Sequence, residues 1–155
     1  MKFLPIVALL LFSLFGSPAD AGEAVAGSLK IGPVWARATP PGASTAAGYL
    51  TVANEGAADD RLLAIEFSAA TGAMLHETTV TDDVSSMRML GNLPVPAGST
   101  VTLKPGALHV MFTGLSGALK KGDQIPGTLV FEKAGRVSVV FDVAPIGADN
   151  PMPSD

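Results

Sequence analysis

The sequence contains no cysteine among its 155 residues. The chain can therefore form no disulfide. In an exported protein this means that the apolar core must stabilise the fold alone. The absence of thiolates also excludes cysteine-bound metal sites, including the His-His-Cys core of a blue-copper centre. Any metal ion must therefore be held by nitrogen, oxygen or thioether sulfur.

Positive charge is scarce as well. Lys and Arg number 10 against 14 Asp and Glu, which gives a formal net charge of −4. The basic residues are scattered along the chain and form no basic run. We therefore expect no nucleic-acid partner.

Long helical periodicity is missing, whereas short runs rich in Val, Leu, Phe and Thr recur between turn residues. This pattern is typical of an all-β sandwich or barrel. A single helical turn could form within Ser116–Asp123, and Ala134-Gly135 predicts a tight hairpin. The predicted strands are Leu29–Arg37, Ala47–Asn54, Arg61–Phe67, Ala73–Val80, Ser86–Leu90, Thr100–Lys104, Leu108–Thr113, Thr128–Glu132 and Arg136–Val143.

The two ends of the sequence differ from its middle. An apolar run follows Met1-Lys2 and ends in the A-x-A site Ala19-Asp20-Ala21, as in a secretory signal peptide. An uncleaved membrane anchor is the alternative, but the run is shorter than the roughly 20 residues that span a bilayer. We predict a signal peptide at 1–21, a periplasmic β domain at 22–144 without stable membrane insertion, and a flexible tail at 145–155.

Only two histidines occur, His76 and His109. In the segment Leu108–Phe112, apolar residues alternate with His109 and Met111, so these two would share the face of a strand that points away from the core. A lone pair of this kind is more often a polar surface residue beside a gap-filling methionine. A hairpin could likewise bring His76 and Met87 to one end of a sheet.

The spacing of these four residues is His76-x10-Met87-x21-His109-x-Met111. It resembles the pattern of the periplasmic copper(I) chaperone family PCuAC, formerly a domain of unknown function. The resemblance covers about residues 29–143 and includes the flanking segments. These segments are Val34–Pro41, Ala47–Val52, Leu75–Glu77, Met87-Arg88, Leu93–Gly98, Lys104–Gly106 and Phe131–Gly135.

The resemblance implies that His76, Met87, His109 and Met111 are ligands of one Cu(I) ion. It implies a cupredoxin-like Greek-key β-sandwich or barrel, and delivery of copper to a copper-accepting protein. That acceptor would be a cytochrome c oxidase subunit with the dinuclear copper centre, or another assembly chaperone. Relatives with a His- and Met-rich tail can take up copper(II), but this tail has only Met152, so a second site is not carried over.

The donor chemistry points the same way independently. Thioethers are soft, uncharged ligands that suit copper(I), whereas zinc prefers Cys, His and carboxylates. Two imidazoles and two thioethers add no charge, so copper(II) would bring a larger desolvation cost than copper(I). The remaining candidates are expected to be structural. At period two Met89 shares a strand face with Met87, and Met74 shares one with His76, so each could be a reserve sulfur, but both are expected in the core or at its rim. Trp35 and Tyr49 are expected in the barrel. Glu77, Asp82 and Asp83 could recruit a harder metal, but they are expected at a solvated strand edge and turn.

Three other functions remain open from the sequence. The chain could buffer copper or confer copper resistance in the periplasm rather than deliver the ion. It could be a structural β-sandwich without metal function. It could be an enzyme, either a copper-dependent oxidase or a hydrolase, which is the runner-up in another class. Both histidines belong to the copper pattern, so none is left for a Ser-His-acid set, and two thioethers disfavour redox turnover. We therefore expect a metal carrier and not an enzyme.

Overall fold

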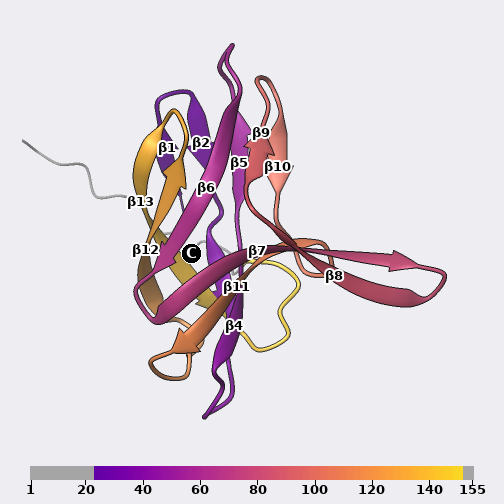
Figure 1. Cartoon of the computed structure of the whole chain (residues 1–155). Helices are drawn as coiled ribbons and strands as arrows, with labels where there is room; N and C mark the ends of the chain where they lie inside the picture. Colours follow the sequence, from indigo (N-terminus) through magenta and orange to yellow (C-terminus); the bar gives the residue numbers. More distant parts are fainter. Residues whose placement is uncertain (1–22, 152–155) are drawn as a thin grey trace, which may run out of the picture.

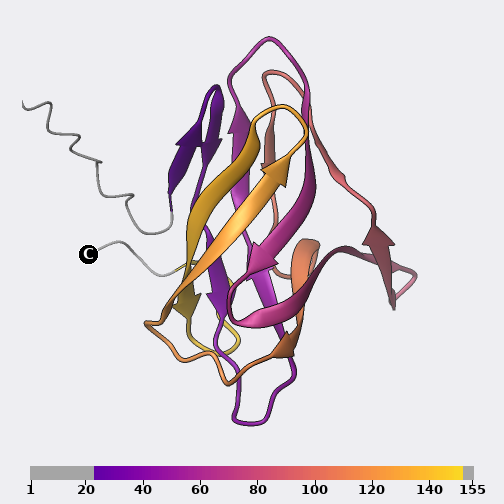
Figure 2. The same ribbon diagram turned by 60° about the vertical axis from the view of Figure 1, so that its left-hand side comes forward.

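The structure is a computed structural model that describes residues 23–151. Within this part of the chain every regular element is a strand, so the all-β prediction is confirmed. The smaller sheet has the order β1-β2-β5-β10, and the larger has the order β8-β7-β11-β4-β3-β13-β12-β6-β9. Figures 1 and 2 show the two sheets wrapped around a common core, while the β7–β8 hairpin projects away from it as an arm.

The smaller sheet consists of β1 (Ala24–Ala26), β2 (Leu29–Ile31), β5 (Thr51–Asn54) and β10 (Thr100–Thr102). The larger sheet consists of β3 (Trp35–Arg37), β4 (Thr45–Tyr49), β6 (Asp60–Phe67), β7 (Ala70–Thr81), β8 (Val84–Leu90), β9 (Leu93–Val95), β11 (Leu108–Leu115), β12 (Gln124–Phe131) and β13 (Gly135–Ala144).

Two of the predicted strands are each divided between the sheets. The predicted strand 29–37 is split at Gly32, whose φ of 147° lies in a region that favours glycine, and Pro33 has no N–H to continue a ladder. The predicted strand 47–54 changes sheet at the buried Leu50. The short strands β1 and β9 were not predicted. The expected helical turn at 116–123 is wrong, because this segment forms bends and a turn in which Asp123 accepts a hydrogen bond from the Lys120 N–H.

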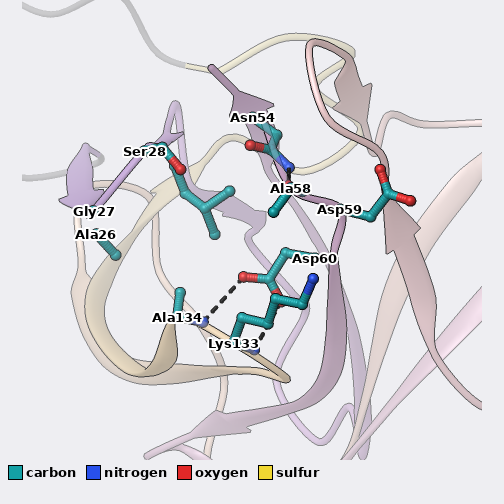
Figure 3. A pocket seen from close by; sticks show the side chains of 10 residues that line it. Ala26, Gly27, Ser28, Asn54, Ala58, Asp59, Asp60, Lys133 and Ala134 are labelled. Atoms are coloured by element: carbon teal, nitrogen blue, oxygen red, sulfur yellow. Dashed lines mark hydrogen bonds between the residues drawn. The ribbon is translucent and has the colours of Figure 1, made fainter. Parts of the chain in front are cut away.

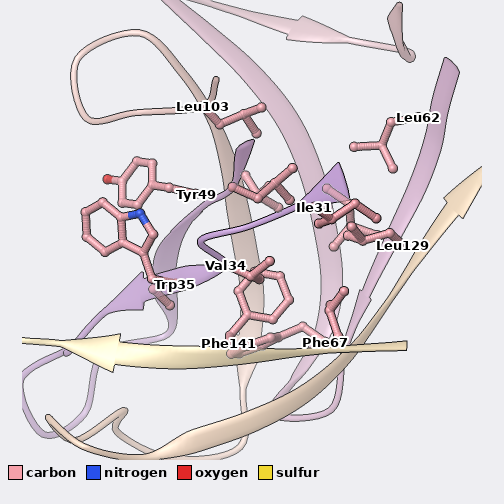
Figure 4. Packing of buried hydrophobic residues seen from close by; sticks show 14 of the residues in the cluster. Ile31, Val34, Trp35, Tyr49, Leu62, Phe67, Leu103, Leu129 and Phe141 are labelled. Atoms are coloured by element: carbon pink, nitrogen blue, oxygen red, sulfur yellow. The ribbon is translucent and has the colours of Figure 1, made fainter. Parts of the chain in front are cut away.

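Aromatic rings fill the space between the sheets (Figure 4). Phe67 stacks on Phe112 with ring centroids 3.9 Å apart, and Phe141 meets both rings edge-on. Gly48 makes room for this cluster, since a Cβ atom there would lie 2.5 Å from a carbon of the Phe112 ring. Trp35 and Tyr49 are also buried, with ring centroids 4.5 Å apart, as the sequence predicted.

The two ends of the chain can be compared with the predictions only in part. The predicted signal peptide at 1–21 lies outside the described residues, as do residues 152–155 of the predicted tail. In the described part of the predicted tail, the carbonyl of Ala148 accepts a hydrogen bond from Arg37 at 2.7 Å, and Asp149 forms an ion pair with Arg37. Within residues 23–151 no helix is long and apolar enough to cross a membrane.

The pocket in Figure 3 is built around the buried carboxylate of Asp60. The carboxylate accepts hydrogen bonds from the backbone N–H groups of Arg61, Lys133 and Ala134 at 2.7 to 3.0 Å. Burial raises the pKa of Asp60, but these three donors outweigh burial and hold the pKa below its ordinary value of 3.8. The pocket contains no His or Met, and Asp60 ties β6 to the turn between β12 and β13.

Asp60→Asn is expected to lower the free energy of unfolding at pH 7 by about 1–3 kcal/mol, because it replaces a charged acceptor of three N–H groups. The folded-state pKa is depressed, so the stabilisation is complete above the unfolded pKa and is lost as pH falls through the folded pKa. Urea denaturation at pH 7 and pH 3 checks both points. The difference from wild type should shrink at pH 3, while Asp83→Asn at the exposed β7–β8 turn should have no effect.

Candidate metal centre

Strand register places all four candidate ligands on one face of the larger sheet, where β8, β7 and β11 lie side by side (Figure 1). His76 on β7 lies directly opposite His109 on β11. Met87 on β8 lies opposite Thr78, one position along the same face from His76. Met111 follows His109 by two residues on β11, and it therefore points to the same side.

Three of the four side chains meet directly. The Nδ1 atom of His76 lies 2.9 Å from the Sδ atom of Met87, across the β7–β8 hairpin. The rings of His76 and His109 have centroids 5.7 Å apart and are almost perpendicular. The register sets the place of Met111 on the same face, beside these three. The hairpin thus brings His76 beside Met87 and His109, and Met111 lies on the same face.

The second histidine is buried. His109 is only 8% exposed, so the interpretation of His109 as an ordinary polar surface residue is wrong. Its Nδ1 lies 3.0 Å from the carbonyl oxygen of Ala107. A carbonyl only accepts hydrogen bonds, so Nδ1 must carry the proton and Nε2 keeps a free lone pair. A backbone carbonyl that fixes the tautomer in this way is typical of metal-binding histidines.

The other histidine is arranged to stay neutral. Burial lowers the pKa of His76 below its ordinary value of 6.5, and the neighbouring His109 lowers it further. At pH 7 this favours the uncharged imidazole, which is the form that binds a metal ion. The Nδ1 atom is the ring nitrogen that faces the sulfur of Met87, and whether it donates a proton or offers a lone pair there is set by the tautomer of the neutral ring.

Hard-metal ligands do not gather at this face. The carboxylate of Glu77 accepts a hydrogen bond from Arg88 Nη2 at 2.6 Å, and strand alternation directs it to the opposite face from His76. Asp82 and Asp83 form the exposed turn of the hairpin, with φ angles of 51° and 61°. In residues 23–151 no group of three or more His, Cys, Asp or Glu could hold a metal ion. The candidate donors on this face are two imidazoles and two thioethers, a set that fits copper(I) better than zinc or magnesium.

The two further methionines lie at the rim of the site. Met74 is 36% exposed and Met89 is 66% exposed, so neither belongs to the core. Met87 is itself 53% exposed on the projecting arm. The exposure of the candidate donors therefore increases from the buried imidazole of His109 to the exposed thioether of Met87 on β8. The sequence showed that Met74 and Met89 could share faces with His76 and Met87, but not that all three strands contribute to one face.

A family model described as "Putative lipoprotein LpqE-like" matches residues 29–143, which is most of the chain. The chain belongs to this family. A relative from Leifsonia xyli subsp. xyli (strain CTCB07), named "Putative lipoprotein Lxx21020", is 31% identical over 126 residues, which cover 81% of this chain and 75% of the relative.

Solved structures agree with this family membership. The apo PCuAC domain of PmoF2 matches with a TM-score of 0.71 and 29% identity, over 83% of this chain and 99% of that domain. The copper-bound form of the PmoF2 domain matches with a TM-score of 0.68 and 28% identity, over 79% and 97%. The copper(I) form of DR1885 from Deinococcus radiodurans matches with a TM-score of 0.59 and 30% identity, over 72% and 74%.

Two predictions are confirmed by these matches. The resemblance to PCuAC domains holds over most of the chain. The cupredoxin-like β-sandwich expected from that resemblance is the fold of this member of the LpqE-like family.

Proposed function

We propose that this LpqE-like protein binds one copper(I) ion through His76, Met87, His109 and Met111 and passes it to another protein. The observation that carries the proposal is the contact cluster of two imidazoles and a thioether, with a second thioether on the same sheet face. Its donor set matches the preference of copper(I) for soft, uncharged ligands. The copper-bound PmoF2 domain and the copper(I) form of DR1885 support the choice of metal.

The surroundings of the site favour a carrier over a permanent copper centre. His109 supports the ion from the barrel, while the sulfur of Met87 is presented on an exposed arm. An acceptor protein can therefore approach the ion from the side of β8, one of the two edge strands of the larger sheet. Two thioethers favour the reduced state, which disfavours an oxidase that must cycle between copper(I) and copper(II). A carrier without catalytic turnover is the function that this geometry supports best.

The proposed acceptor is the dinuclear copper centre of cytochrome c oxidase, or an assembly chaperone that serves it, in the periplasm. The predicted signal peptide supports an exported carrier. Copper buffering is the alternative, and it would show as binding without transfer.

With reductant present, the protein without residues 1–21 is expected to bind one copper(I) ion per chain. It should bind copper(I) at least about a hundredfold more tightly than zinc, or about 2.8 kcal/mol, because two of its donors are thioethers. Competition titrations against coloured copper(I) and zinc chelators measure both affinities. Equal affinity for the two metals would contradict the proposal. Mixing the copper-loaded protein with an apo oxidase copper domain then separates delivery from buffering.

A further inference from the structure

All methionines and histidines within residues 23–151 lie on one sheet face. The face is formed by β7, β8 and β11, and the registers of these strands place alternate residues on it. Four of the six side chains make up the proposed copper set, whereas the other two have no role in it. The six residues are Met74, His76, Met87, Met89, His109 and Met111.

The two remaining methionines each lie beside a member of the copper set. Met89 is directly opposite His76 in the β7–β8 register. Met74 is directly opposite Met111 in the β7–β11 register. Side chains directly opposite in antiparallel strands have Cβ atoms about 4.5–5.5 Å apart, which is within reach of a shared ion for a side chain as long as methionine. Each extra sulfur can therefore reach an ion held by its neighbour.

Packing does not account for these two residues. Met89 is 66% exposed, and Met74 is on the border between half-buried and exposed. An exposed methionine gains little from burial, and methionine is not among the residues that favour strands. On the other face of β8, the two middle positions Ser86 and Arg88 are polar, as an exposed edge strand favours, whereas the end positions Val84 and Leu90 are apolar. The sulfur atoms themselves are the property that distinguishes Met74 and Met89.

We propose that Met74 and Met89 are exchange ligands, which bind the copper(I) ion transiently as it enters and leaves the four-residue site. This inference rests on the proposed copper(I) function. A Cu–S bond to Met89 forms as the bond to Met87 breaks, and Met74 replaces Met111 in the same way. Copper stays in the +1 state throughout, all four sulfurs are neutral, and no proton or electron moves.

Exchange of one sulfur for another lowers the barrier to release. An ion that left the site directly would lose a ligand before it gained another, whereas a neighbouring thioether lets the new bond form as the old one breaks. Met89 lies on β8, an edge strand of the larger sheet, and is more exposed than Met87. It therefore presents the ion to an acceptor at the sheet edge, while His109 still holds the ion from the barrel side.

Stopped-flow transfer of copper(I) to a saturating coloured chelator tests the proposal on the full mature protein. Met89→Leu and Met74→Leu keep volume and apolar character but remove the sulfur. Transfer is expected to slow by about tenfold in Met89→Leu and further in the double variant. Equilibrium affinity should stay within about threefold of wild type, because the four resident ligands remain. Val80→Leu, at an equally exposed position on the same arm, is the matched control and should transfer at the wild-type rate.

A second readout follows the sulfur atoms directly. With half an equivalent of copper(I), the methyl NMR signals of Met74 and Met89 should broaden by exchange alongside those of Met87 and Met111. Wild-type transfer rates in both leucine variants, or unaffected methyl signals, would overturn the assignment. A loss of affinity in Met89→Leu as large as that in Met87→Ala would also overturn it, because Met89 would then be a resident ligand. If the wild-type protein bound no copper(I), the proposed function itself would fail instead.

Discussion

The double variant Met87→Ala/Met111→Ala is expected to lose nearly all specific copper(I) binding. Changes to groups that only support a metal ligand commonly cost 10–100-fold in affinity, so loss of a ligand should cost more than about a hundredfold for each single variant. His76→Ala and His109→Ala should each have an effect of the same size. In His76→Ala the sulfur of Met87 also loses its 2.9 Å contact partner, so the remaining donors are less well placed.

The measurement is a competition titration against a coloured copper(I) chelator, with reductant present and with circular dichroism to confirm that each variant is folded. Met152→Ala is the matched control, since it removes a methionine outside the four-residue pattern and should bind as wild type does. Unchanged affinity in the double variant would mean that the sulfurs do not bind copper. The site would then have to be sought elsewhere than on β7, β8 and β11.

Phe112→Ala is expected to reduce the free energy of unfolding by about 3–5 kcal/mol, the usual cost of removing a buried aromatic ring from a core. The ring is completely buried and stacks on Phe67 at 3.9 Å. Its removal leaves a cavity between the sheets, because Gly48 has no side chain that could fill the space. A domain without disulfides has no covalent link to offset this loss.

Urea denaturation of the metal-free protein, followed by circular dichroism, measures this effect. Val80→Ala on the exposed arm is the control and should change stability by less than about 0.5 kcal/mol. The two variants together show whether stability comes from the core, to which Phe112 belongs, rather than from the exposed arm that carries Val80. A loss below about 1 kcal/mol for Phe112→Ala would show that the core can collapse around the missing ring.

Local pattern was sufficient to predict much of the fold. Alternation of apolar and polar residues in Leu108–Phe112 correctly put Val110 and Phe112 in the core and His109 on the other face. Local pattern failed where a single apolar run passes from one sheet to the other. The run 29–37 reads as one strand, yet it changes sheets at Gly32-Pro33, because the backbone angles there depend on which strands lie alongside.

From the sequence alone came the resemblance of its spacing to the PCuAC pattern, which implies the candidate set His76, Met87, His109 and Met111, and the chemistry of these residues indicated a soft metal ion. Only the tertiary structure decided that His109 is buried with its Nδ1 held by Ala107, and that Met74 and Met89 join the same face. The reason is that the register between β7 and β11 arises from pairing between residues far apart in the sequence, such as Met111 with Met74 and Leu115 with Ala70. A shift of one residue would have turned these side chains to the other face, and no local pattern determines that choice.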